Sequence, residues 1–370
     1  MQRAKHARGL RFLPKLAWIT TVAVSAAICY QASAQNVYTP PVGFITWNIQ
    51  GTTGSPLNPA TTYLGLGMTQ LPIQAGIVAS VTSNQVVDSS NTFTNNQFTV
   101  AGVGSPCEIE FLSPTGSPTN YAYAGLIDEV VSSPAGNSIY LASTAEAGLI
   151  GAGYRYQIRP SWTLNTLFGT NDSAGLQAGS GSGSADNINV WNPNTQLYTT
   201  YYYRTGSGWR STASLTINTG TNALYLDQGI VLVRRGAASV ANQVIGAVKY
   251  SDINVAQLGP TIIPVIGGTK LTVAGNVEAS SITLAQSGLY TGSSSTGVQT
   301  GSGSGSADNI NVWNPTTQLF ATYYYRTGAG WRSTASLTID ASTNLIPLGG
   351  AVQILRRNAN SFNWYLPQVY

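Results

Sequence analysis

The chain has little with which to carry out histidine or cysteine chemistry. It contains one histidine, His6, and two cysteines, Cys29 and Cys107, among 370 residues. His6 and Cys29 lie in an N-terminal stretch typical of a removable export signal. Without histidine the remaining chain cannot form a Ser-His-Asp triad, a Cys-His pair or a His-ligated zinc site. Cys107 has no partner for an intramolecular disulfide, and no neighbouring Lys or Arg lowers its pKa, so we expect a buried, inert thiol.

Charge is also scarce, at 8% of residues. Five of the 17 basic residues lie in positions 1–34, which leaves 12 basic against 13 acidic residues in the rest of the chain. A nucleic-acid binder needs a basic surface to displace the counterions of phosphate groups. We therefore expect no nucleic-acid partner.

The export signal has the usual three parts. A basic start is followed by the apolar run 16–28 and then by Ala32-Ser33-Ala34, a small-x-small pattern that signal peptidase accepts. The run is shorter than the about 20 residues that span a bilayer. Because no later stretch is long and apolar enough, we expect an extracellular, cell-surface or periplasmic protein with no membrane span after removal of residues 1–34.

The residues that are abundant favour strands and turns. The chain has 40 glycines and 10% aromatic residues, whereas strong helix formers such as Glu and Lys are few. An internal repeat is plain, because residues 179–217 and 301–339 differ at only four of 39 positions, among them Asn194 and its counterpart Thr316. Each copy divides into short strands, which predicts an all-β fold with modules built as a meander, a sandwich or a barrel-like sheet. We expect a signal at 1–34, an N-terminal β-rich region at 35–150, and repeat modules at 151–245 and 246–370.

Alternation along the second strand of each copy predicts two faces. In the first copy Leu197, Thr199, Tyr201 and Tyr203 share the side that we expect to be the core. The opposite side is expected to be solvated and to carry an aromatic patch with arginines. Aromatic rings stack on sugars, but the same rings also stabilise sheets by pairing across strands. The hypothetical ligand-binding residues are Trp191, Tyr198, Tyr202, Arg204, Trp313, Tyr324 and Arg326; Trp209 and Trp331, which follow tight turns, are predicted to be core residues.

Several stretches together resemble a family of exported, uncharacterised bacterial β-rich proteins. They include Tyr156–Gly169, Ala185–Trp191, Tyr201–Tyr203, Gly208–Arg210 and Arg234–Arg235, and the second copy echoes them up to Arg356–Arg357. The resemblance implies export and a β-rich structure, and it implies no catalytic activity.

Other sites and architectures remain as alternatives. Gly181–Asn189 and Gly303–Asn311 partly resemble a calcium-binding turn, although Asp186 and Asp308 are more typical of residues that accept hydrogen bonds from turn backbone. A hydrolase would use paired carboxylates, with Glu108/Glu110 and Asp128/Glu129 as candidates. Phe362, Trp364, Leu366 and Tyr370 alternate like an outer-membrane barrel strand, or form a final edge strand blunted by Pro367.

These observations favour a non-catalytic, exported structural or cell-surface interaction protein with no cofactor or metal. Its expected partners are an extracellular polysaccharide, other surface proteins or further copies of itself. The main alternative is a pair of carbohydrate-binding modules that use exposed aromatics. Exposure of Trp191 and Tyr202 on one face would favour binding, and burial of these rings would favour a scaffold.

Overall fold

The computed structural model describes residues 41–52, 58–114, 123–144, 148–249 and 261–367. The expected signal at 1–34 lies outside these residues. Strands make up 45% of the chain and helices 3%, which confirms the all-β prediction. Within the described ranges the helices are α2 (Val100–Val103) and α3 (Leu164–Phe168), and no helix there is long and apolar enough to cross a membrane.

The first repeat copy forms a five-stranded antiparallel sheet that also takes in a strand from far upstream. Its order is β13 (Gly208–Ser211), β12 (Leu197–Arg204), β11 (Asn187–Asn192), β15 (Ile230–Arg234) and β2 (Ala60–Leu64). Only β11 to β13 run as the expected meander. β15 crosses to the other side of β11 because the segment β14 (Ala223–Leu224) leaves the sheet to pair with β10 (Trp162–Thr163).

The second copy forms a sheet of the same order. It consists of β22 (Gly330–Ser333), β21 (Leu319–Arg326), β20 (Asn309–Asn314), β24 (Ala351–Arg356) and β18 (Lys270–Gly275). The bounds of β20 to β22 lie 122 residues after those of β11 to β13. Here β23 (Leu345–Ile346) leaves the sheet to pair with β19 (Ile282–Thr283).

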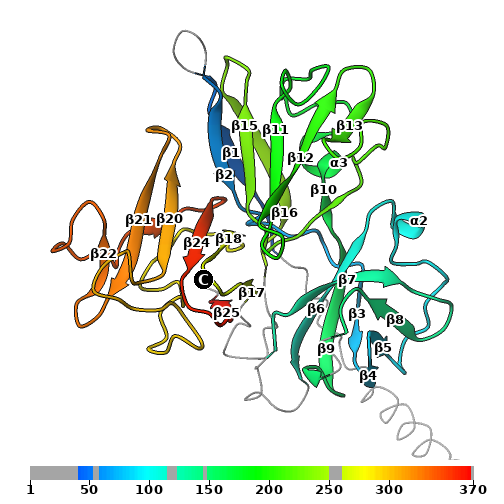
Figure 1. The fold of residues 1–370 in the computed structure, drawn as a ribbon. Coiled ribbons are helices and arrows are strands. Elements are labelled where there is room, and N and C mark those ends of the chain that lie inside the picture. Colours follow the sequence, from blue (N-terminus) through cyan, green and yellow to red (C-terminus); the bar gives the residue numbers. More distant parts are fainter. Residues whose placement is uncertain (1–40, 53–57, 115–122, 145–147, 250–260, 368–370) are drawn as a thin grey trace, which may run out of the picture. The chain divides into compact units, whose positions relative to one another are not determined.

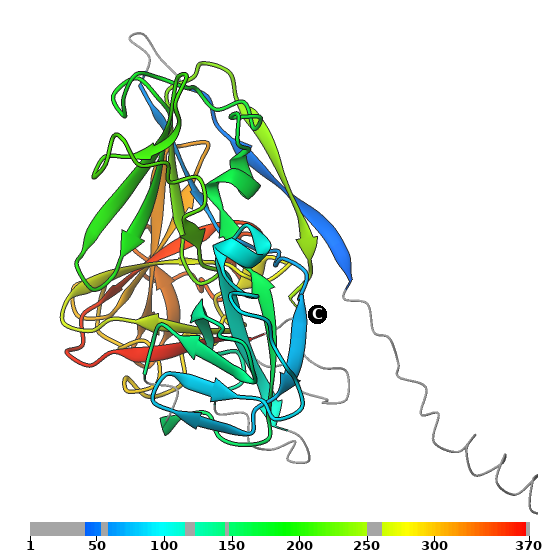
Figure 2. The same ribbon diagram turned by 90° about the vertical axis from the view of Figure 1, so that its right-hand side faces the viewer.

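Each sheet is accompanied by a two-stranded ribbon. β1 (Val42–Ile49) pairs with β16 (Val240–Ala247), and β17 (Thr261–Val265) pairs with β25 (Phe362–Leu366). In Figures 1 and 2 the blue strand β1 lies beside the yellow-green strand β16 along its length. We call β1, β2 and β10 to β16 module one, and β17 to β25 module two. Phe362, Trp364 and Leu366 of β25 are buried in the core.

A seven-stranded antiparallel sheet is inserted into module one between β2 and β10. Its order is β3 (Gln74–Ile77), β9 (Tyr154–Pro160), β6 (Cys107–Pro114), β7 (Ile127–Ser132), β8 (Ser138–Leu141), β5 (Gln85–Val87) and β4 (Ser80–Thr82). This inserted sheet has a hydrophobic core of its own, to which Cys107, Ile109 and Phe111 contribute, while the two modules share a second core. Cys107 is a buried free thiol, and burial raises its pKa to about 12, as expected of an inert cysteine.

The strand pairing crosses the boundary expected at residue 150. β1 and β2 precede that boundary, yet they pair with β16 and β15, which follow it. Their counterparts in module two are β17 and β18. For example, Tyr63 of β2 pairs with Val231, and Val273 of β18 pairs with Gln353, which lies 122 residues after Val231. The sequences of β1 and β2 differ from those of β17 and β18, so the internal repeat is not recognisable in these strands from the sequence. The division at 35–150, 151–245 and 246–370 stays a prediction about domains.

The two faces predicted for the second strand are right in part. Tyr201 packs in the core, and Trp209 and Trp331 are buried there as predicted. Leu197, however, is 67% exposed because it lies at the hairpin tip, where it pairs with Asn192 beyond the core. Tyr202, on the side expected to be solvated, is only 1% exposed.

Candidate functional site

The half-buried ring of Trp191 is anchored on the other module. Its indole Nε1 donates a hydrogen bond of 2.8 Å to the carbonyl of Leu271 in β18. Gln196, which ends the turn that follows β11, makes two hydrogen bonds with the backbone of Leu271. Its Nε2 donates to the Leu271 carbonyl at 2.9 Å, and its Oε1 accepts from the Leu271 N–H at 2.8 Å. The side-chain amide thus satisfies a main-chain donor and acceptor on an edge strand.

Module two makes the same contact in the opposite direction. Trp313 donates from Nε1 to the carbonyl of Thr61 in β2 at 2.8 Å. Gln318 accepts from the Thr61 N–H at 2.6 Å and donates to its carbonyl at 3.1 Å. Thr61 and Leu271 are counterparts, because they face Val233 and Leu355, which lie 122 residues apart. We call these two sets of contacts the reciprocal clasp.

The clasp depends on an unusual turn. The backbone of Gln196 has a φ of 57° and that of Gln318 a φ of 56°, in the left-handed region that residues with a Cβ rarely adopt. The turn is held by Asn192, whose Oδ1 accepts from the N–H groups of Asn194 and Thr195. The Gln196 N–H donates back to the Asn192 carbonyl at 2.9 Å. This geometry places the glutamine side chain on the neighbouring module.

The predicted ligand-binding residues differ in their exposure, since Tyr198 is 40% exposed while Tyr202 is buried. Trp191 packs edge-on against Tyr198 with centroids 4.6 Å apart, and Trp313 packs in the same way against Phe320 at 4.7 Å. Tyr324, like Tyr202, is 1% exposed. The loop after each hairpin lies over this side of the sheet, because Arg204 donates to the Leu215 carbonyl and Arg326 to the Leu337 carbonyl.

The aspartate of each repeat forms a buried ion pair. Asp186 Oδ2 lies 2.5 Å from Arg234 Nη1 and accepts from the Gln177 N–H, while Oδ1 accepts from the Arg235 N–H. Asp308 and Arg356 repeat the arrangement, with both side chains fully buried. As predicted, both aspartates accept hydrogen bonds from backbone N–H groups, but these donors are 9 and 49 residues away in sequence and do not belong to the aspartate's own turn. Arg234 and Gly236 cover the carboxylate that the calcium alternative would use.

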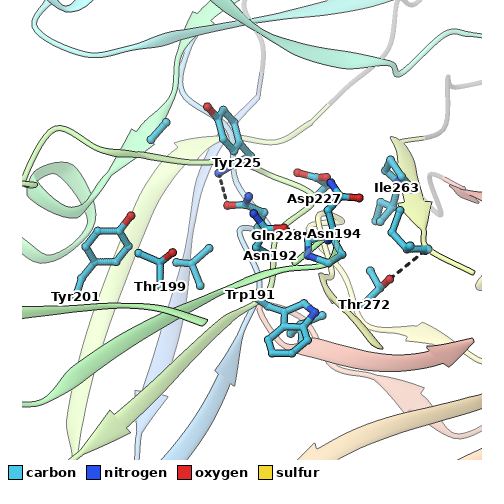
Figure 3. A pocket seen from close by; sticks show the side chains of 16 residues that line it. Trp191, Asn192, Asn194, Thr199, Tyr201, Tyr225, Asp227, Gln228, Ile263 and Thr272 are labelled. Atoms are coloured by element: carbon cyan, nitrogen blue, oxygen red, sulfur yellow. Dashed lines mark hydrogen bonds between the residues drawn. The ribbon is translucent and has the colours of Figure 1, made fainter. Parts of the chain in front are cut away.

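A cleft of about 420 Å³ opens beside Trp191 (Figure 3). Module one contributes Trp191 and the turn after it, together with Tyr201 of β12 and the segment 225–228 that follows β14. Module two contributes β17 and β18 through Ile263, Thr272 and their neighbours. Asn194, Asp227 and Gln228 all line this cleft and are labelled in Figure 3. Sequence reasoning missed Asp227 and Gln228, which lie outside the near-identical block.

The carboxylates Glu108 and Glu110, which were candidates for a hydrolase, are buried. Both are 2% exposed, and they extend from the face of β6 opposite to its apolar core. Burial alone would raise the pKa of Glu110, but Lys249 and Arg159 outweigh this effect and lower it to about 2. For Glu108 burial dominates and raises the pKa to about 8. Among the described residues no group donates a hydrogen bond to Glu108 Oε2.

A second, acidic cleft of about 290 Å³ adjoins the first. It is lined by Asp128 and Glu129 of β7 and by Tyr225, Asp227 and Gln228 of module one. Tyr225 donates from its hydroxyl to Glu129 at 2.5 Å. Burial raises the pKa of Asp227 to about 6. Sequence reasoning named Asp128 and Glu129 but could not bring Asp227 to them, because the two segments are about a hundred residues apart.

Comparison of the chain with family models, with curated proteins and with solved structures finds no match. The resemblance to exported β-rich bacterial proteins stays a prediction.

Proposed function

We propose that the chain is a non-catalytic, exported structural or cell-surface interaction protein. Export rests on the N-terminal sequence and not on the described structure. The remaining chain acts through cohesion and contact, either with further copies of itself, with other surface proteins or with an extracellular polysaccharide.

The reciprocal clasp carries this proposal. Trp191 and Trp313 join the two modules through the hydrogen bonds that their indole N–H groups donate. Tyr63 of β2 adds to the same interface, with its ring 5.4 Å from that of Trp313 and 5.2 Å from that of Phe320. Aromatic pairs of this kind add about 0.5–1.5 kcal/mol each beyond the burial of their surface. A structure in which repeat modules bind each other through such rings suits a scaffold.

The buried ion pairs support the same proposal. In Glu110 the carboxylate is paired with both Lys249 and Arg159, and in Asp186 with Arg234. A carboxylate held in this manner is a poor proton donor and is shielded from substrate. These groups therefore serve the fold.

Trp313→Ala tests the proposal. Because the indole is packed against Tyr63 and Phe320 and hydrogen-bonded to Thr61, its removal should lower the stability by about 3–5 kcal/mol, read from urea unfolding. Leu337→Ala, on an exposed loop of the same module, serves as the control and should unfold almost like the parent. Equal stability of parent and Trp313→Ala would remove the support that the clasp gives to a scaffold.

A carboxylate-dependent hydrolase is the second candidate. The acidic cleft favours it, because Glu129 and Asp227 line the same cleft and the raised pKa of Asp227 suits a general acid. Release of reducing ends from neutral polysaccharides by the parent, abolished by Glu129→Gln and by Asp227→Asn, would establish this activity. Absence of product from the parent would leave the non-catalytic proposal standing.

A further inference from the structure

The surroundings of Trp191 and of its counterpart Trp313 differ. In module two the position next to Trp313 is filled by the ring of Tyr63, 5.4 Å from the indole. A separate cleft of about 310 Å³ in module two is lined by Ala321 and Tyr323. Tyr63 occupies the position that corresponds to Val273, since their partners Val231 and Gln353 are 122 residues apart. Trp47 corresponds to Ile263 for the same reason. Trp47 pairs with Asn242, and Ile263 pairs with Trp364, which lies 122 residues after Asn242.

The polar side of the cleft is also unique. Asp227 and Gln228 are replaced by Gly349 and Gly350 at the related positions, 122 residues later. A Cβ at Gly349 would lie 3.2 Å from the indole of Trp47, which shows how closely the ring packs there. The cleft beside Trp191 thus has two aliphatic side chains where module one supplies two rings to the related position, and two polar side chains where that position has two glycines.

The chemistry of the cleft selects a class of ligand. Because the Trp191 N–H is already donated to Leu271, this residue offers a ligand apolar ring surface. Around it lie the amides of Asn192, Asn194 and Gln228 and the hydroxyl of Thr199. Lysine and arginine are missing from the described lining, and its single charged group is Asp227. Such a lining repels anions and suits hydroxyl groups above an apolar face.

We infer that this cleft binds an uncharged saccharide. The sugar ring packs on Trp191, and its hydroxyl groups hydrogen-bond to the amides of Asn194 and Gln228. The volume of about 420 Å³ is in the range of small-ligand sites. This inference rests on the proposed interaction role and deepens it, because it names a polysaccharide as the partner and assigns it to the cleft beside Trp191, which residues of both modules line.

Affinity electrophoresis of the full mature chain tests the inference. Native gels would contain hydroxyethyl cellulose, dextran, mannan or, as the charged comparison, polygalacturonate. We expect at least one neutral polymer to retard the protein and polygalacturonate to leave its mobility unchanged. Normal mobility in all three neutral polymers, or retardation by polygalacturonate alone, would overturn the inference.

Matched variants locate the site. Asn194→Thr installs the residue that the same turn carries at Thr316, so the fold should be retained, and Gln228→Ala removes the second amide. We expect the double variant to bind about tenfold more weakly, a loss of about 1.4 kcal/mol. Thr316→Asn, in the turn next to the filled position, is the control and should bind like the parent. Unchanged affinity of the double variant would contradict the assignment.

A filling variant gives an independent readout. Val273→Tyr installs the residue that fills the related position, and it should abolish retardation. Urea unfolding of this variant separates filling of the cleft from loss of the fold. Because the scaffold proposal is tested at Trp313 by unfolding and this inference at Asn194 and Gln228 by binding, either can fail without the other.

Discussion

Gln196 satisfies both main-chain groups of Leu271 with its side-chain amide, accepting from the N–H at 2.8 Å and donating to the carbonyl at 2.9 Å. Leu271 belongs to β18, an edge strand of its sheet, and Thr61 of the edge strand β2 is held by Gln318 in the same way. Unpaired edge strands are templates for aggregation. The clasp therefore protects two edges while it joins two modules.

Gln196→Gly isolates the contribution of this side chain. Glycine adopts a positive φ without strain, so the variant removes the amide and keeps the turn. Because the Leu271 N–H then loses Gln196 Oε1 as its acceptor, we expect the free energy of unfolding to fall by about 1–3 kcal/mol in urea titrations. Gln318→Gly should cost a similar amount if the two halves are equivalent. Unfolding midpoints that match the parent in both variants would show that the clasp is not stabilising.

Asp308→Asn tests the buried ion pair of module two. The variant leaves the guanidinium of Arg356 buried beside a neutral side chain, and breaking such a pair costs about 3–5 kcal/mol. Asp340→Asn is the control, because Asp340 is exposed and 3.5 Å from Arg332, where solvent screens the interaction. Chemical denaturation should therefore separate the two variants clearly. A similar, small loss in both would contradict the structural role of Asp308.

Glu108 should make the stability depend on pH between about 4.5 and 8. Its pKa is raised by burial from 4.5 to about 8, so the folded state keeps a proton that the unfolded state releases. This contribution is complete below about pH 4.5 and is lost as the pH rises through about 8. Glu108→Gln has no carboxyl that titrates at this position, so its stability should not fall in this way. The stability of the variant should therefore rise relative to that of the parent as the pH increases from about 4.5 to about 8.

Thermal unfolding of parent and Glu108→Gln at pH 5 and pH 9 measures this difference. Glu110 does not interfere, because its pKa is lowered to about 2 and its contribution is constant above about pH 4.5. Parallel curves for the two proteins over this range would show that Glu108 is ionised in the folded state.

Processing of the N-terminus tests the export prediction. When the chain is produced in a bacterium with its own first 34 residues, the exported product should begin at Gln35, because Ala32-Ser33-Ala34 precedes it. N-terminal sequencing or intact mass measures the outcome, and Ala34→Arg should block cleavage. A product that retains Met1 would contradict export by this route.

Local structure within the repeat was largely predictable. Alternation predicted short strands in each copy, among them the strand with Leu197 to Tyr203 that is β12, and the position of Trp209 after a tight turn identified it as a core residue. The same reasoning was wrong at Tyr202, because the alternation of a strand does not reveal that a later loop covers its outer side. It also missed Gln196, since a positive φ at glutamine has no sequence signature.

The all-β class and the positions of the repeated strands follow from the amino-acid sequence. Short-range alternation and turn residues carry that information, and both are readable along the chain. The three-dimensional structure was needed to show that β1 and β2 complete module one and that each module binds the edge strand of the other. It was also needed to show that Val273 lines a cleft, whereas its counterpart Tyr63 packs against Trp313. These features depend on contacts between residues as many as 257 positions apart, which local patterns do not encode.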